Sequence, residues 1–130
     1  MFFFDGDARI GFSIDKGIAG HVAATGDRVI CNDPYADRRF NRKIDEDTGF
    51  TTRNILCEPV KSRLGGAVVA VLQMVNKKND QEFTAQDAEV MEICVLKVAH
   101  ALETRFSALL SLEREWVRGS VGGGRRPSQL

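Results

Sequence analysis

The stretch Thr48-Gly49-Phe50-Thr51-Thr52-Arg53-Asn54-Ile55-Leu56-Cys57 links a polar region to an apolar one, and the expected fold follows from that change. Residues 54–60 form a short, mostly apolar run, which predicts a β-strand. Residues 34–52 before it are polar and irregular, and they far exceed the ~4–6 residues of most connections in compact domains. We therefore expect a partly helical lid over a pocket at 34–52, followed directly by a strand.

Turn and apolar residues predict the other elements. Asp5-Gly6-Asp7 separates two apolar runs and is a strong hairpin signal. The candidate N-cap Asp15 and the stop signal Gly26 bound a short helix. Residues 67–75 are apolar almost throughout, which favours a central strand buried on both faces. The expected elements are a hairpin over residues 2–14, a helix over 17–26, strands over 28–32, 54–60 and 67–75, and a helix from 84 to about 115.

The last helix is the longest. Thr84 is its candidate N-cap, and Asp87 stands at the third helical position as an acidic variant of the capping box. Apolar residues then recur at alternating three- and four-residue steps, interrupted by Arg105, which is the spacing of a seam between helices. Because this seam is longer than a small core can cover, we expect a homodimer formed through the helix. The seam residues are Val95, Val98, Leu102, Leu109, Leu112 and Trp116.

These elements predict an α+β fold, with an antiparallel sheet, helices against one face, and a long C-terminal helix. The 130 residues include 18 basic and 18 acidic side chains, and 43% are hydrophobic, as in one ordinary globular domain. A net charge of zero argues against a nucleic acid partner. No apolar run approaches the ~20 residues that span a membrane. Three widely spaced cysteines favour neither disulfides nor zinc, and they indicate a reducing, cytoplasmic compartment.

Residues suited to catalysis are few. His21 and His100 stand far apart without a metal-binding spacing, so we expect no metal site. The adjacent acids at 45–47 lie in a polar stretch, and we interpret them as solvated and not as a catalytic pair. Cys57 lies on an expected strand without a cationic neighbour in sequence to lower its pKa, which favours a core residue over a nucleophile.

The start of the first helix, Gly17-Ile18-Ala19-Gly20, is the clearest candidate for a binding site. Small residues there would let a ligand approach free backbone N–H groups, and a helix N-terminus attracts anions. The same glycines would equally let the helix pack tightly under a strand. The residues alone leave both interpretations open.

Four blocks follow one another along the chain: Gly17–Gly20, Asn32–Asn41, Thr48–Cys57 and Val75–Lys77. In this order they resemble a GAF domain, and more narrowly the regulatory GAF domains of cyclic nucleotide phosphodiesterases. The resemblance covers residues 2–104, and the block at 48–57 is its most specific part. It implies a regulatory module that binds cGMP or cAMP, has no catalysis of its own, and works with a phosphodiesterase catalytic domain and a second copy of itself.

The resemblance also implies a pocket. Ile18 and Ala19 match backbone donors to the cyclic phosphate, and Phe4 and Asp5 match residues that face the purine. Asn41 stands where relatives often carry an aromatic residue, and Gln73 where some carry glutamate. The implied ligand-binding residues are Phe4, Asp5, Ile18, Ala19, Phe40, Asn41, Thr48, Thr52 and Gln73.

Base chemistry favours cGMP over cAMP. Guanine presents two adjacent donors, which a carboxylate at Asp5 would accept, whereas adenine presents a donor and an acceptor. The family also carries a structural signature, which matches Asn76, Lys77, Phe83 and Asp87, with Lys77 and Asp87 as an ion pair. Ala88 replaces the acid that ends this signature.

The expected organisation is a GAF domain over 1–104, a connecting helix over 105–116 and a flexible tail over 117–130. Members of the family begin with a helix and two strands before Phe4, so we expect weak or no binding by these 130 residues alone. Two alternatives stay open. One is a degenerate GAF domain that only dimerises. The other is reduction of methionine sulfoxide by lid cysteines, which is disfavoured because residues 34–52 contain no cysteine.

Overall fold

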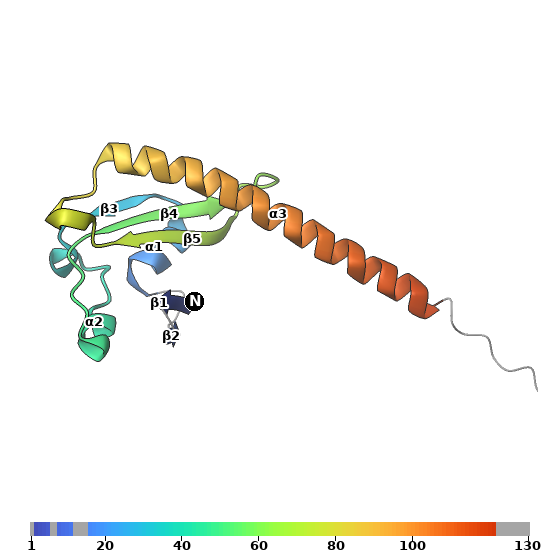
Figure 1. Ribbon diagram of the computed structural model, residues 1–130, viewed down its shortest axis with the longest axis horizontal. Helices are drawn as coiled ribbons and strands as arrows, with labels where there is room; N and C mark the ends of the chain where they lie inside the picture. The colour runs from blue at the N-terminus through green and yellow to red at the C-terminus, as the bar shows by residue number, and fades with distance from the viewer. Residues whose placement is uncertain (1, 6–7, 12–15, 122–130) are drawn as a thin grey trace, which may run out of the picture. The chain divides into compact units, whose positions relative to one another are not determined.

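The computed structural model describes residues 2–5, 8–11 and 16–121 (Figure 1). The chain forms two compact units, Met1–Ala99 and His100–Leu130. In order, the elements are β1 (Phe2–Asp5), β2 (Ala8–Gly11), α1 (Gly17–Thr25), β3 (Val29–Cys31), the 3-10 turn η1 (Pro34–Ala36), α2 (Arg42–Thr48), β4 (Ile55–Lys61), β5 (Val68–Val75), the 3-10 turn η2 (Lys78–Asp80) and α3 (Ala85–Val121). This arrangement confirms the expected α+β class with a long C-terminal helix.

The strands form two antiparallel sheets. β1 and β2 pair as a hairpin, and β3, β4 and β5 form a three-stranded sheet in that order. The expectation that residues 67–75 form the central strand is wrong: β4 is central, and β5 lies at the edge of this sheet with Val69 and Met74 exposed. Local apolarity does not distinguish the two strands, because strand order is set by packing partners distant in sequence.

Residues of β4 are buried on both faces of the sheet, since successive side chains of a strand point to opposite sides. Ile55 and Cys57 pack with Ile18 and Val22 of α1. Leu56 and Val60 pack instead with a second cluster, which includes Phe83, Ala88, Met91, Val95 and Ala99. Helices therefore cover both faces, and not one face as expected, with α1 and α3 on opposite sides of the sheet (Figure 1).

The start of α3 matches the sequence signals. The Asp87 carboxylate accepts a hydrogen bond from the Thr84 backbone N–H at 2.8 Å, and the Thr84 hydroxyl accepts one from the Asp87 N–H at 3.3 Å. Lys77 Nζ lies 2.7 Å from Asp87 Oδ2. This lysine lowers the pKa of Asp87, which keeps the carboxylate charged as the cap requires.

The end of α3 differs from expectation. The helix continues through Val121, so the segment from 117 to 121 is helical where a flexible tail was expected, and residues 122–130 lie outside the described part of the chain. Arg118 in this stretch is a good helix former, which the glycines that follow it obscured. Within the described residues, no helix is long and apolar enough to cross a membrane.

Arg28 connects three elements of the first unit. Its guanidinium contacts Glu58 of β4 through two hydrogen bonds, of 2.5 and 3.1 Å, and Glu92 of α3 through one of 3.1 Å. The Glu58 side chain is 8% exposed, whereas that of Arg28 is 33% exposed. A carboxylate this deeply buried needs a cation and hydrogen bonds to stay charged. Arg28 thus allows Glu58 to lie between the sheet and α3.

We predict that Arg28→Met lowers the free energy of unfolding by about 2 kcal/mol, because it leaves the buried carboxylate of Glu58 without its cationic partner. This is below the ~3–5 kcal/mol of fully buried pairs, since Arg28 is partly solvated. Arg53→Met is the matched control: Arg53 pairs with Asp80 at 3.3 Å with both side chains exposed, and such pairs contribute at most ~1 kcal/mol. Urea unfolding of both variants measures the difference, and equal losses would contradict this role of Arg28.

Candidate ligand-binding site

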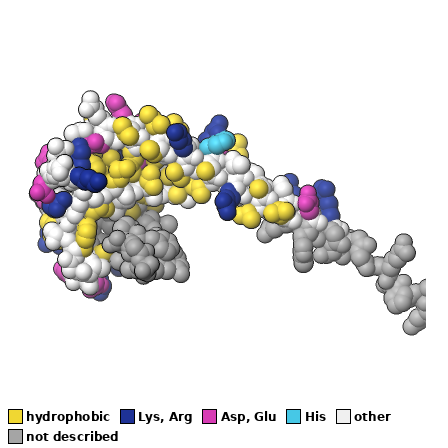
Figure 2. Space-filling view, in the orientation of Figure 1, with side chains coloured by type: hydrophobic (Ala, Val, Ile, Leu, Met, Phe, Trp, Pro, Cys, Tyr) yellow, Lys and Arg dark blue, Asp and Glu magenta, His cyan; other side chains and the backbone are white. Residues whose placement is uncertain are grey.

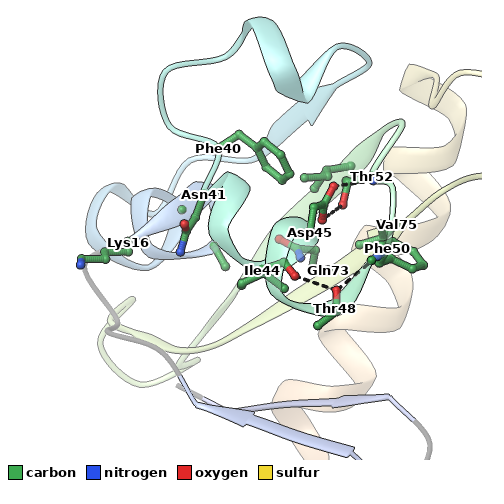
Figure 3. Close-up of a pocket in the computed structure, with 14 residues that line it drawn as sticks. Lys16, Phe40, Asn41, Ile44, Asp45, Thr48, Phe50, Thr52, Gln73 and Val75 are labelled. Atoms are coloured by element: carbon green, nitrogen blue, oxygen red, sulfur yellow. Dashed lines mark hydrogen bonds between the residues drawn. The ribbon is translucent and has the colours of Figure 1, made fainter.

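A cavity of about 560 Å³ lies on the face of the sheet that α1 covers. It falls within the ~300–1,000 Å³ typical of small-molecule sites. Its walls come from α1, α2, the segments around α2, and the strands β4 and β5 (Figure 3). The lining residues are Lys16, Gly17, Ala19, Phe40, Asn41, Ile44, Asp45, Thr48, Gly49, Phe50, Thr52, Ile55, Gln73 and Val75.

The sheet supplies the floor of the cavity. Ile55 of β4 is paired with Val75 of β5, and Gln73 is paired with Cys57. Because alternate residues of a strand share a face, these positions lie on the α1 side of the sheet. Gln73 brings a carboxamide, which both donates and accepts hydrogen bonds, to a floor that is otherwise apolar.

The N-terminus of α1 forms one wall. Gly17 has a φ of +76°, a conformation that other residues adopt only with strain, and Gly17 and Ala19 both line the cavity. Lys16, and not the expected Asp15, occupies the N-cap position, and the Lys16 side chain has no acceptor with which to cap the first turn. The N–H groups of this turn therefore receive no hydrogen bond from the side chain at the N-cap position. The side chain at that position, Lys16, is instead a cation.

Helix α2 lies over the cavity. Asn41 caps its start, since the Asn41 Oδ1 accepts a hydrogen bond from the Lys43 N–H at 3.2 Å. Gly49 ends it with a φ of +71°. Phe40, just before the helix, points toward the interior of the cavity (Figure 3). The region expected to be a partly helical lid therefore contains one short 3-10 turn and one α-helix.

Asp45 holds this lid in place. It is 6% exposed, and its carboxylate accepts three hydrogen bonds of 2.7 Å, from the Tyr35 hydroxyl, the Thr52 N–H and the Thr52 hydroxyl. The interpretation of the acids at 45–47 as solvated is therefore wrong for Asp45, although Glu46 and Asp47 are exposed. The spacing of residues in the helix could have indicated the burial of Asp45. Asp45 lies one helical turn after the cap Asn41, and its apolar neighbour Ile44 also lines the cavity.

The two threonines are engaged within the protein. The Thr48 hydroxyl donates to the Ile44 carbonyl at 2.6 Å, and the Thr52 hydroxyl donates to Asp45. A hydroxyl has one proton to donate, but its oxygen can still accept. In this arrangement Thr52 can therefore accept a hydrogen bond from a ligand, and it can donate one only by releasing Asp45.

Three asparagines fasten the loops at the end of the sheet. Asn32 exchanges two hydrogen bonds with the backbone of Phe83, and Asn54 accepts from the Lys77 N–H and donates to the Gln81 carbonyl. Asn76, at a φ of +57°, bonds the backbone of Thr51 and Arg53. Side-chain amides mimic backbone partners in this way where loops cannot form a ladder. These bonds fix the segment that carries Thr52.

Most of the expected ligand residues come together here. Ala19, Phe40, Asn41, Thr48, Thr52 and Gln73 all line the cavity, whereas the Ile18 side chain is 2% exposed in the core and does not. The side chains of Phe4 and Asp5 lie outside what the structure describes. Eight further lining residues were not among the expected ligand-binding residues: Lys16, Gly17, Ile44, Asp45, Gly49, Phe50, Ile55 and Val75.

The cysteines bear on the enzymatic alternative. Burial raises the pKa of Cys57 to about 12 and also raises the pKa of Cys31, so neither is an activated thiolate at neutral pH. Cys94 is exposed on α3, and none of the three lines the cavity. In the described residues, no group of three or more potential ligands is placed to bind a metal ion.

Comparisons with known proteins agree with this geometry. The model of the GAF domain family matches residues 3–103. The probable 3',5'-cyclic phosphodiesterase pde-5 of Caenorhabditis elegans is 46% identical over 101 residues, and the dual 3',5'-cyclic-AMP and -GMP phosphodiesterase 11 of Drosophila melanogaster is 42% identical over 81 residues. These matches cover 75% and 62% of this chain, but only 14% and 6% of the two relatives.

A solved structure shows the same fold. The GAF domain of an Acinetobacter phosphoenolpyruvate-protein phosphotransferase superposes with a TM-score of 0.59 at 17% identity, over 79% of this chain and 56% of that one. Such low identity supports the fold alone. The family model, however, spans most of the chain and includes every element from β1 to the first half of α3. The chain belongs to the GAF domain family.

Proposed function

We propose that this chain is a regulatory module that binds a 3',5'-cyclic nucleotide in the cavity beneath α2, cGMP in preference to cAMP, and carries out no catalysis itself. The observation that carries the proposal is the first turn of α1, which borders a cavity of ligand size. A cyclic nucleotide has one negative charge. A helix N-terminus holds an anion through its N–H groups and its dipole, without any requirement for net protein charge.

The remaining walls suit the rest of such a ligand. Ile55, Val75 and Phe40 offer apolar surface to a flat base, and the Gln73 carboxamide offers both a donor and an acceptor. The Thr52 hydroxyl oxygen could accept a hydrogen bond from a donor on the ribose or on the base. Relatives at 46% and 42% identity are named as phosphodiesterases of cyclic nucleotides, which supports the same class of ligand for this chain.

Regulation follows from the layers of the first unit. A ligand would contact α1 and α2 on one face of the sheet, and α3 covers the other face. We propose that closure of α2 on the ligand shifts the sheet and thereby α3, which passes the signal to a phosphodiesterase catalytic domain in a longer parent protein. Three free cysteines support a reducing, cytoplasmic site of action.

We predict that Lys16→Glu weakens binding of both cGMP and cAMP by about ten-fold. Reversing a charge at the helix N-terminus changes the interaction with a bound anion by about 1.4 kcal/mol, from two charge steps of ~0.7 kcal/mol each. Titration calorimetry measures this on the chain and the variant, both extended at the N-terminus with the parent sequence. Lys78→Glu makes the same change in net charge at an exposed position of η2. Equal weakening by both variants would show that overall charge, and not the α1 terminus, attracts the ligand.

Base preference has its own test. With Asp5→Ala we predict a loss of about ten- to a hundred-fold in cGMP affinity, because a buried donor without its acceptor costs ~1–3 kcal/mol. Affinity for cAMP should change much less, since adenine has one donor fewer at that edge. The titrations are performed on a chain extended at its N-terminus with the parent sequence. If cGMP and cAMP lose affinity equally, Asp5 shapes the site and does not distinguish the bases.

A second candidate function, dimerisation, is favoured by the exposed side chains of α3. Leu102, Leu109 and Leu112 are 44%, 57% and 62% exposed, and they continue the face of the helix that Val95 begins in the core. Figure 2 shows hydrophobic side chains on the surface along this helix. A seam with this spacing normally packs against another helix. We propose that a second copy of this chain covers it.

We predict that sedimentation shows a dimer at high micromolar concentration, and that Leu109→Asp converts it to a monomer, because a buried carboxylate without a cation is strongly unfavourable. Ser107→Asp is the control and should remain dimeric. Ser107 is exposed and lies two residues before Leu109, on the other side of the helix. A monomeric parent chain, or a dimer that Leu109→Asp leaves intact, would contradict dimerisation through this seam.

A further inference from the structure

A second cavity, of about 500 Å³, adjoins the first and is bordered by basic side chains. Lys16 and His21 come from the start and the body of α1, and Arg38 and Arg39 come from the segment that leads to α2. We call this cavity the basic cleft. It shares Lys16, Gly17, Phe40 and Asn41 with the nucleotide cavity, whereas His21, Arg38 and Arg39 border the cleft alone.

The charges of the cleft are only partly compensated. Arg39 contacts the Asp37 carboxylate through hydrogen bonds of 3.0 and 2.6 Å, which lower the pKa of Asp37 and fix the guanidinium. Arg38 and Lys16 are exposed, and neither forms an ion pair with another described residue. Among the described residues that line the cleft, none is acidic. The net charge of the chain is zero, whereas the charged residues that the structure describes in the lining of this cleft are all basic.

The shape of the cleft allows an anion to reach these groups. Gly20 and Ala24 lie one helical turn apart on the α1 wall. Gly20 has no side chain and Ala24 has only a methyl group, so little side-chain volume stands beside His21. The cations stand on two walls, α1 on one side and residues 38–39 on the other. A chain of two or three phosphates offers more oxygens over a greater length than one phosphate group does, and it could contact cations of both segments at once. Arginine suits this role because its planar fork matches phosphate oxygens.

We propose that the basic cleft binds the di- or triphosphate group of a small molecule. This goes beyond the proposed function, because the ligand carries more charge than a cyclic mononucleotide and meets residues that the nucleotide cavity lacks. Free pyrophosphate and a nucleoside triphosphate share this chemistry. They differ in whether a base is present to stack on the Phe40 ring, which borders both cavities.

Calorimetric titration of the whole chain, without cyclic nucleotide and at low salt, tests the proposal with pyrophosphate and with ATP. We expect saturable binding of both, because unpaired cations attract phosphate most strongly when screening is low. Arg38→Ala should weaken both at least about ten-fold, since it removes a charge-assisted contact. Equal affinities would indicate that the phosphates alone are bound, and tighter ATP would indicate that the base contributes; both support the cleft.

Two control variants locate the site. Lys97→Ala removes one exposed positive charge on α3 and should bind pyrophosphate as the parent chain does. Gln73→Ala alters only the nucleotide cavity, so it should leave pyrophosphate binding unchanged whether or not cGMP binds there. The proposal is overturned if the parent chain shows no saturable binding, if Lys97→Ala loses as much as Arg38→Ala, or if Gln73→Ala does. The last result would mean that the anion occupies the nucleotide cavity.

Discussion

Strand β4 buries side chains on both faces of a three-stranded sheet, so each face needs its own covering layer. Helix α1 meets this requirement on one face and the first part of α3 on the other. Because α1 is only nine residues long, it covers part of its face, and the rest is the floor of the cavity beneath α2. A ligand in that cavity would therefore touch the same sheet that supports α3, and this shared sheet is the physical basis of the regulation that we propose.

The lid over the cavity depends on polar groups more than on apolar packing. Asp45 binds Tyr35 and Thr52 at once, and a buried carboxylate that lost these partners would carry a large desolvation cost. The lid therefore has a well-defined closed arrangement, and opening it requires that water replace three hydrogen bonds together. The hydrogen bond to Asp45 also raises the pKa of Tyr35, so the phenol stays a donor throughout the physiological range. The asparagines at 54 and 76 hold the far end of the same segment.

Local sequence signals predicted what local interactions determine. The Thr84–Asp87 cap and the stop at Gly26 each depend on neighbours within a few residues, and each was found where expected. Strand order and the Arg28–Glu58–Glu92 contacts depend on residues up to 64 positions apart, which no pattern in the sequence specifies. The cavity shows the same division. Ala19, Thr52 and Gln73 were expected from family resemblance, whereas Asp45 was missed because its neighbours are exposed acids.

We propose that the N-terminal turn of α1 holds the phosphate of a cyclic nucleotide beneath α2. Backbone amide chemical shifts test this most directly because each amide reports separately, and they are followed by NMR while cGMP is titrated into the chain extended at its N-terminus with the parent sequence. We predict that the largest saturable changes fall on Gly17, Ile18 and Ala19, whose N–H groups would bind the phosphate, and on Thr52, whose N–H is bonded to Asp45. Changes confined to other segments, or changes that never saturate while the chain stays folded, would contradict it.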